Sequence, residues 1–234
     1  MKANIELPPG MTFTGDQRAL TWGERPMVPT TVCIPTHPAR GAANDPASLL
    51  GQAVASVEAQ EWMPAGGWVI ACDLNGDGAA ATRQRALDLV HTEFVSFLDS
   101  DDRLYPRHLR AHFELLSLVG NGGPPLWADV AYSWFDGVNP FPQHRGRQLD
   151  PADPHHTTMT ITVRTELAKR IGMRANPDAN REWAGEDWLF IKSLADAGAR
   201  FVGTGEITWH YRGHNGNTSG HPWLGDGPAI TKLP

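Results

Sequence analysis

One short stretch of the sequence places carboxylates where they could bind a metal ion. The segment "FLDSDD" at residues 97–102 sets Asp99 and Asp101 two positions apart, and in an extended chain such residues face the same side. Two carboxylates that face one spot repel each other unless a cation lies between them, and Mg²⁺ or Mn²⁺ would in turn suit a diphosphate. In the alternative interpretation, Asp101 and Asp102 only cap a helix that starts shortly after them.

A second acidic turn, "DLNGDG" at residues 73–78, resembles the start of a calcium-binding loop. Its oxygen ligands would stand at loop positions one, three and five, with a glycine at six. The twelfth position, counted from Asp73, is Gln84, where such a loop needs a bidentate Glu, and the residues before Asp73 are typical of a strand. The pattern therefore favours a turn after a strand over a calcium site.

Two further groups carry ionisable side chains near glycines. Glu186 and Asp187 stand just before the apolar run "WLFIKSL". Acidic residues stabilise the start of a helix in any protein, so helix capping alone could explain them. His210 and His214 have the four-residue spacing of zinc ligands on a helix, but the glycines and asparagines of "WHYRGHNGNTSG" oppose a helix there. We therefore expect no zinc site, and we expect His210 to be structural.

The elements that must position these residues alternate between strands and helices. Residues 30–36, 67–72 and 93–102 read as strands, and residues 47–60 and 79–90 as helices with apolar residues three and four apart. This order predicts a parallel sheet wrapped by helices, in which ligands gather at the carboxyl ends of the strands. In the second half we expect helices within 104–119 and 186–198, strands within 128–137 and 199–212, and a strand running into a helix within 158–172.

Composition excludes several classes of protein. The 234 residues are 41% hydrophobic and 20% charged, with a formal net charge of -6, so no positive field favours nucleic acid or an anionic membrane. There is no apolar stretch of about 18 residues and no signal-peptide pattern, which predicts a cytoplasmic protein without a transmembrane segment. Cys33 and Cys72 lie in apolar runs and are expected to be buried free thiols.

The order of motifs resembles the family 2 glycosyltransferases of the GT-A fold, from about Thr31 to Ser219. Five matches carry the resemblance: "TVCIPT" with the helix "LLGQAVASVEAQ", "VIACDLNGDG" with "TRQRAL", "FVSFLDSDD", "AGEDWLF", and "YRGHNGNTS". Gln84 and "DLNGDG" depart from the usual pattern of the family. The resemblance implies an α/β fold of Rossmann-like type, with a central, mostly parallel mixed sheet flanked by helices.

The resemblance also implies a division of the chain. Residues 1–28 are expected to form an irregular arm, residues 29–220 a single GT-A domain, and residues 221–234 a tail. Within the domain, residues 29–103 would be the nucleotide-binding half and residues 104–220 the acceptor half.

Site roles follow from the same resemblance. Asp187 would be the general base, with Glu186 beside it holding the acceptor or orienting Asp187. Asp101, Asp99 and His214 would bind the catalytic Mn²⁺ or Mg²⁺. Donor contacts would come from Pro35, Thr36, Asp73, Arg83, Asp99, Ser100, Arg212 and Ser219. For Arg83 the open alternatives are a solvated helix face or a salt bridge to a nearby acid. Trp134, Trp183 and Trp188 could stack on a sugar face.

The function implied is metal-dependent, inverting transfer of a sugar from a nucleotide-diphosphate sugar, foremost a UDP-sugar, to a hydroxyl acceptor. Two alternatives stay open. A nucleotidyltransferase would need a glycine-rich basic loop after the first strand, where "HPARGAANDP" offers only Arg40 and Gly41. A non-catalytic carbohydrate- or nucleotide-sugar-binding relative would not need its acids at 99, 101, 186 and 187.

Overall fold

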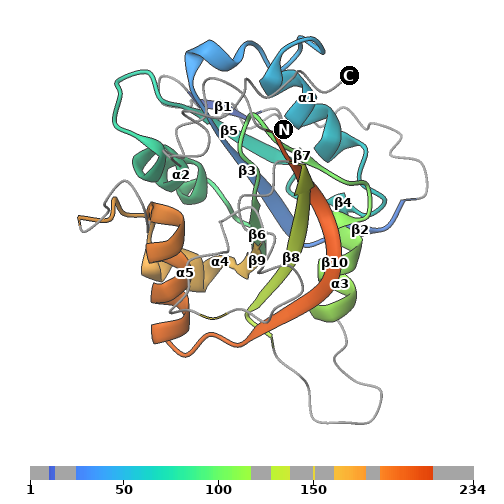
Figure 1. Ribbon diagram of the computed structural model, residues 1–234, viewed down its shortest axis with the longest axis vertical. Coiled ribbons are helices and arrows are strands. Elements are labelled where there is room, and N and C mark those ends of the chain that lie inside the picture. Colours follow the sequence, from blue (N-terminus) through green and yellow to red (C-terminus); the bar gives the residue numbers. More distant parts are fainter. Residues whose placement is uncertain are drawn as a thin grey trace, which may run out of the picture.

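A computed structural model describes residues 11–13, 25–116, 128–137, 150, 161–177 and 185–212. Its centre is an eight-stranded sheet in the order β1-β5-β3-β6-β9-β8-β10-β7, beside a two-stranded sheet of β2 and β4 (Figure 1). The strands are β1 (Met11–Phe13), β2 (Met27–Val28), β3 (Thr30–Thr36), β4 (Met63–Pro64), β5 (Trp68–Cys72), β6 (Phe94–Phe97), β7 (Arg103–Leu104), β8 (Val130–Gly137), β9 (Ile161–Arg164) and β10 (Phe201–Tyr211). The helices are η1 (Pro38–Arg40), α1 (Leu49–Glu58), α2 (Ala79–Asp88), α3 (His108–Leu116), α4 (Thr165–Ile171) and α5 (Glu186–Asp196).

The sheet is mixed, as expected, and its parallel pairings are β3 with β5, β3 with β6, and β8 with β10. The strand β9 runs antiparallel to both β6 and β8. Because β9 reverses direction between them, β8 and β10 point the same way as the three parallel strands. The carboxyl ends of β3, β5, β6, β8 and β10 therefore lie at the same end of the sheet, which is called the carboxyl edge below. Ligands of α/β proteins gather at this end.

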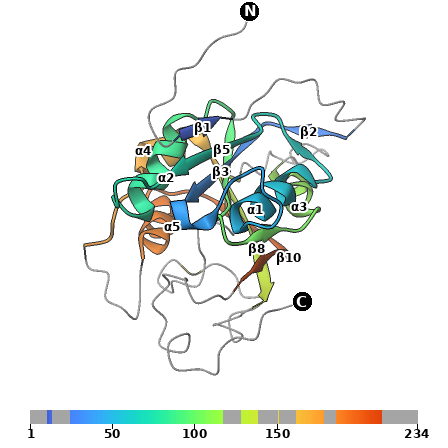
Figure 2. The same cartoon turned by 90° about the horizontal axis from the view of Figure 1, so that it is seen from above.

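Helices cover both faces of the sheet and make two separate cores. One core packs α1 and α3 against residues such as Ile34, Phe135 and Trp209, and the other packs α2, α4 and α5 against residues such as Phe97 and Ile161. Figures 1 and 2 show these two groups of helices on opposite sides of the sheet. The fold is thus a three-layer sandwich of helices, sheet and helices.

Side-chain hydrogen bonds fix the starts of α1 and α3. The side chain of Ser48 accepts a hydrogen bond from Gly51 N at 2.9 Å and caps α1. Gln60, fully buried after α1, donates to Tyr105 O and accepts from Leu109 N at 3.0 Å in the first turn of α3. One buried amide therefore satisfies backbone groups of two segments far apart in the sequence.

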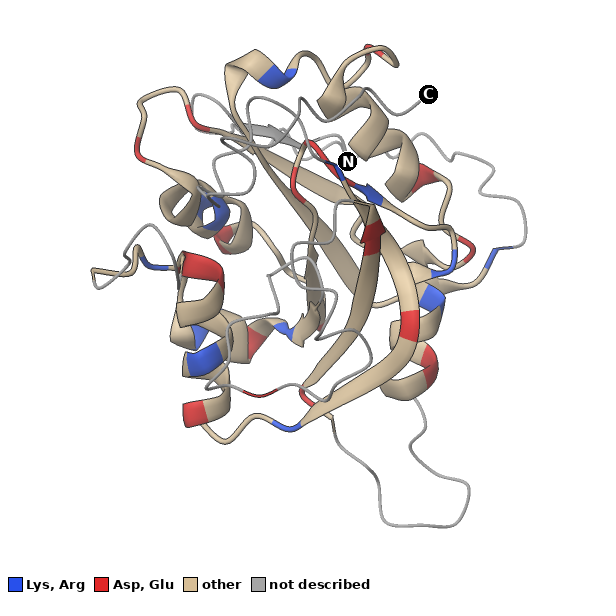
Figure 3. Cartoon of the chain, in the orientation of Figure 1, with Lys and Arg blue, Asp and Glu red and all other residues tan. Residues whose placement is uncertain are grey.

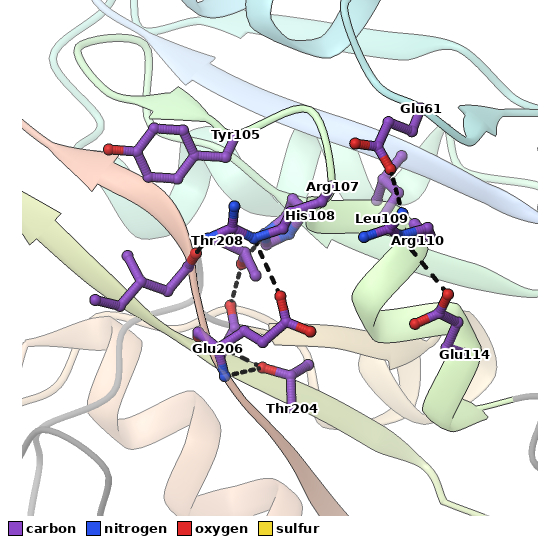
Figure 4. Close-up of polar contacts among 12 residues, drawn as sticks. Glu61, Tyr105, Arg107, His108, Leu109, Arg110, Glu114, Thr204, Glu206 and Thr208 are labelled. Atoms are coloured by element: carbon purple, nitrogen blue, oxygen red, sulfur yellow. Dashed lines mark hydrogen bonds and ion pairs between the residues drawn. The ribbon is translucent and has the colours of Figure 1, made fainter.

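The strand β10 pairs with β7 at Trp209 and His210, and the side chain of Arg107 covers a backbone carbonyl of β10 just before that pairing. Arg107, just before α3, donates to Ile207 O at 2.6 Å and pairs with Glu206 at 3.1 Å (Figure 4). A cation placed on a strand carbonyl blunts an edge that would otherwise accept another strand.

The expected arm at residues 1–28 contributes two short strands among its described residues. Met11–Phe13 forms β1 and pairs antiparallel with β5, and Met27–Val28 pairs parallel with β4. No periodicity marks these strands in the sequence, because strands of two or three residues are too short to show one. Within the described ranges, no helix is long and apolar enough to cross a membrane.

Candidate active site

Three carboxylates meet in the turn that follows β6. Ligand atoms of Asp99, Asp101 and Asp102 all lie within 4.8 Å of one another. The segment is not the extended strand that we predicted: β6 ends at Phe97, and Asp102 N donates to Asp99 O at 3.0 Å, which closes a turn. The clustering of Asp99 and Asp101 was therefore predicted for the wrong geometric reason. The alternative of helix capping is also wrong, since β7 separates these acids from α3, which begins at His108.

Asp102 is the third member of this cluster, beside the predicted metal ligands Asp99 and Asp101. Its side chain is buried, one oxygen accepts from Arg212 N at 2.8 Å, and the other oxygen has no hydrogen-bond partner among the described residues. Burial, followed by the charge of Asp101, raises the pKa of Asp102 well above its ordinary value. A buried, unsatisfied carboxylate oxygen beside two other carboxylates fits a hard divalent cation. The presence of three aspartates within residues 99–102 was the feature of the sequence from which a metal-binding Asp102 could have been predicted.

Arg83, on α2, connects this turn to the start of α5. Its Nη2 lies 2.6 Å from Asp99 Oδ1, while its Nη1 lies 3.0 Å from Asp187 Oδ1 and also pairs with Glu186. The side chain of Arg83 is only 5% exposed, so the solvated helix face is wrong and the salt bridge to acids is confirmed. In Figure 3 the basic stretch of α2 lies next to the acidic start of α5.

Asp187 has the electrostatics of a proton acceptor that works near neutral pH. Burial raises the pKa of Asp187 to about 7; the Arg83 charge opposes the shift, and the charges of Glu186 and Asp99 add to it. A carboxylate with a pKa near the working pH can take a proton and release it again. Burial also raises the pKa of Asp99, although Arg83 opposes that shift.

The "DLNGDG" turn is organised around Asp73, which follows β5. The Asp73 carboxylate accepts from Asp77 N at 2.8 Å and from Gly78 N at 3.0 Å. Burial opposes the charged form of Asp73, but these amide hydrogen bonds and the charge of Arg85 outweigh it and lower the pKa. Asp77 pairs with Arg85 at 2.9 Å. Both carboxylates thus have partners within the protein, as expected of a capped turn.

The remaining donor-side residues lie along the carboxyl edge. Pro35 and Thr36 end β3, and Thr36 O accepts from Asp73 N at 2.9 Å, which joins two strand ends. Ser100 is buried in the acidic turn. Arg212, after β10, donates through its side chain to Asp101 O and at 2.7 Å to Gln52 of α1.

Two basic residues that the sequence did not assign to this site also lie there. Arg40, in η1, pairs with Asp101 at 3.0 Å, and Arg103 donates to the same Gln52 oxygen as Arg212. Burial, and next the charge of Arg103, lower the pKa of Arg212. Guanidinium groups beside an acidic turn offer bidentate donors to a phosphate. Arg40 was noted in the sequence only as the basic residue of the loop after the first strand, and no motif marked Arg103, although it directly follows Asp102.

The tryptophans and histidines singled out in the sequence differ in their exposure and contacts. Trp134, in β8, is only 6% exposed, while Trp188, in the first turn of α5, is partly exposed. His210 contacts Asp136 through Nδ1 at 2.8 Å, and Tyr105 donates to the same carboxylate at 2.7 Å, which agrees with a structural His210. The predicted residues Trp183, His214 and Ser219 lie outside the described part of the chain.

Comparison with known proteins identifies the fold. No protein-family model and no curated protein sequence matches the chain. Among solved structures, the chain is similar to Staphylococcus aureus TarS residues 1–349 in complex with UDP-GlcNAc, with a TM-score of 0.60 and 18% identity over 82% of this chain and 60% of that one. It is also similar to the mannosyltransferase PcManGT from Pyrobaculum calidifontis in complex with GDP-Man and Mn²⁺, with a TM-score of 0.57 and 14% identity over 86% of this chain and 64% of that one.

These similarities confirm the expected GT-A fold of glycosyltransferases. The chain spans about 60% of the length of the TarS 1–349 structures that it matches and 36% of the longer TarS structure. Membership of family 2 stays a prediction, because identities of 14–18% establish the fold alone.

Proposed function

We propose that this chain is a metal-dependent, inverting glycosyltransferase that moves a sugar from a nucleotide-diphosphate sugar to a hydroxyl acceptor. One observation carries the proposal. At the carboxyl ends of the strands of a GT-A sheet, Arg83 joins an acidic turn suited to a divalent cation to Asp187, whose pKa is about 7. Structural neighbours of the chain hold UDP-GlcNAc, or GDP-Man with Mn²⁺, and a UDP-sugar is the first donor to test.

In this proposal the donor binds at the carboxyl ends of β3, β5 and β6. The turn capped by Asp73 brings backbone close to the nucleotide base, and Arg40 and Arg212 face the diphosphate. Asp101, Asp99 and Asp102 would hold the Mn²⁺ or Mg²⁺, which when bound would stabilise the negative charge of the departing nucleotide diphosphate. The chain's halves at residues 29–103 and 104–220 then serve donor and acceptor.

Asp187 takes the proton of the acceptor hydroxyl as its oxygen attacks the anomeric carbon. A single in-line displacement inverts the configuration at that carbon, because the leaving group departs from the opposite face. Glu186 holds the acceptor or orients Asp187, and Trp188 offers a partly exposed ring to a sugar. A reducing compartment such as the cytoplasm fits the free thiols of Cys33 and Cys72.

A donor screen tests this function without knowledge of the acceptor. The pure protein is incubated with UDP-, GDP- and TDP-sugars and Mn²⁺, and slow release of nucleotide diphosphate by hydrolysis is measured with and without chelator. We expect release with at least one donor, and loss of that release with chelator and in Asp101→Ala. Binding of a nucleotide sugar without any release would instead support the non-catalytic alternative.

The nucleotidyltransferase alternative is less well supported by the geometry. That reaction needs a glycine-rich basic loop after the first strand, and the loop after β3 offers only Arg40 and Gly41. The same screen separates the two reactions by their products, because a nucleotidyltransferase would release or consume pyrophosphate from a nucleoside triphosphate.

A further inference from the structure

Arg83 contacts acids on both sides of the proposed reaction. Asp99 belongs to the donor-side turn after β6, whereas Glu186 and Asp187 begin α5 on the acceptor side. The two terminal nitrogens divide between them: Nη2 faces Asp99, and Nη1 faces both acids of α5. One guanidinium is therefore the bridge between two segments that are 87 residues apart or more in the sequence.

We propose that Arg83 is a positioning residue that fixes Glu186 and Asp187 against the donor-side turn at Asp99. This inference rests on the proposed function for its catalytic meaning. It also revises the sequence-based role of Arg83 as a donor contact, because its side chain is 5% exposed and both of its terminal nitrogens are engaged by carboxylates.

The start of α5 depends on this arginine for its alignment. The helix has Gly185 at its N-cap position and no side-chain capping hydrogen bond. Within the described residues, the ion pairs of Glu186 and Asp187 both go to Arg83. Without the guanidinium, adjacent negative charges would face Asp99 and repel it, and the helix start would move away from the donor site.

An arginine is required for this task rather than any cation. A planar guanidinium presents nitrogens on two sides at a fixed spacing, while a lysine offers a single ammonium nitrogen. Three carboxylates also hold the guanidinium in its charged form: burial opposes the charge, but Asp187, Asp99 and Glu186 outweigh it and raise the pKa of Arg83 further. The guanidinium of the bridge therefore stays charged.

Position on α2 explains how a charged residue reaches the interior. Arg83 lies on the same helical face as Ala80 and Leu87, which pack in the core beneath the sheet. The side chain emerges from this buried face between the turn after β6 and the start of α5. The apolar face thus sets the depth of the guanidinium, and the acids determine its direction.

Hydrogen exchange of two backbone amides tests the positioning directly. Asp102 N is bonded to Asp99 O at 3.0 Å, and Leu189 N is bonded to Gly185 O at 3.2 Å. In Arg83→Gln we expect both amides to exchange at least about tenfold faster than in the wild type. Arg110→Gln is the matched control, because Arg110 also pairs with two acids, Glu61 and Glu114, but on α3 (Figure 4). Faster exchange at only one of the two amides would overturn the bridge.

Kinetics of Arg83→Lys separate positioning from donor binding. We expect kcat for donor hydrolysis to fall about 10²-fold, with the Kd for UDP and Mn²⁺ unchanged within about threefold. A weaker Kd with unchanged kcat would make Arg83 a donor contact and contradict the proposal. If neither donor nor nucleotide binds, the proposed function fails, and the exchange result alone still decides the positioning. Should Arg83→Gln not fold, Arg83→Lys is used for both measurements.

Discussion

Nη1 of Arg83 lies 3.0 Å from Oδ1 of Asp187, at the second position of α5. This ion pair holds an acid whose oxygen Oδ1 is buried. A fixed, partly desolvated carboxylate is suited to proton transfer, because it loses little solvation when it accepts the proton. The contact thus connects the fold of α2 and α5 to the chemistry proposed for Asp187.

The first prediction concerns Asp187→Asn. Because Asn keeps the shape of Asp187, and α5 has no side-chain capping hydrogen bond to lose, nucleotide affinity and folding should change little. Sugar transfer should nonetheless fall about 10²-fold or more, as expected when a positioned base is lost. The control is Asp196→Asn at the end of the same helix, where the acid pairs with Lys192 at the surface. Wild-type transfer by Asp187→Asn would leave Asp187 a structural residue.

The second prediction is a dependence of kcat on pH. Since burial raises the pKa of Asp187 to about 7, with Arg83 opposing that shift, the carboxyl is protonated below this pH and cannot accept a proton. The rate should therefore rise with pH and level off above about 7, with a loss of about tenfold per pH unit on the acid side. Steady-state rates between pH 5.5 and 8.5 would check this, and a flat profile would contradict it.

Much of the nucleotide-binding half could be predicted from the sequence, because its elements are long and regular. The run "TTVCIPT" forms β3 over the predicted residues, and the spacing of Ala80, Arg83 and Leu87 marks the buried face of α2. The resemblance also drew attention to Asp187. Periodicity and a motif together were sufficient wherever neighbours along the chain carry the signal.

Contacts between distant segments were beyond such reasoning. Asp102 joins the acidic cluster because a turn, and not a strand, follows Phe97, and nothing in "LDSDD" distinguishes the two. The approach of Arg40 to Asp101 depends on how η1 folds over the edge of the sheet. The reversed direction of β9 was likewise not predicted, since pairing partners are chosen by the whole sheet.

A third prediction links nucleotide binding to the metal. UDP should bind measurably with Mn²⁺ and much more weakly with chelator, because the acidic turn repels a diphosphate unless a cation is present. Asp101→Ala should abolish this difference, and Asp102→Ala should reduce it. Asp88→Ala, on the surface of α2, is the control and should behave as the wild type. Calorimetry that gives equal affinities with and without metal would contradict the prediction.

The fourth prediction concerns the turn after β5. Asp73→Ala removes the acceptor of the Asp77 and Gly78 amides, so the turn should loosen and UDP affinity should fall while its dependence on Mn²⁺ remains. Millimolar Ca²⁺ should not bind there, since Asp77 is paired with Arg85. Asp77→Ala is the comparison, because it removes a surface ion pair without removing the cap. An ion centred on Asp73, Asn75 and Asp77 would overturn this interpretation.

The last prediction concerns stability in acid and rests on two buried histidines of α3. His108 and His112 are fully buried, with ring centroids 4.2 Å apart, and their Nδ1 atoms contact Thr208 and Thr162 at 2.7 Å. Burial lowers the pKa of His108 to about 3, against the opposing hydrogen bond from Thr208; burial and the charge of His108 lower that of His112 well below its ordinary value.

The direction in which stability changes with pH follows from the unfolded state, in which the pKa of a histidine is near 6.5. The folded protein keeps His108 neutral, so its contribution to stability is complete above about pH 6.5 and is lost as pH falls toward 3, by about 1.4 kcal/mol per pH unit. His108→Gln should lower stability at pH 7 but lose about 2 kcal/mol less than the wild type between pH 7 and pH 5. Urea unfolding of both proteins at both pH values measures this difference. The effect of carboxylates that titrate in both proteins cancels when the two stability changes are subtracted. His91→Gln, at an exposed site, is the control. An equal acid loss in His108→Gln and the wild type would show that His108 is not held neutral by the fold.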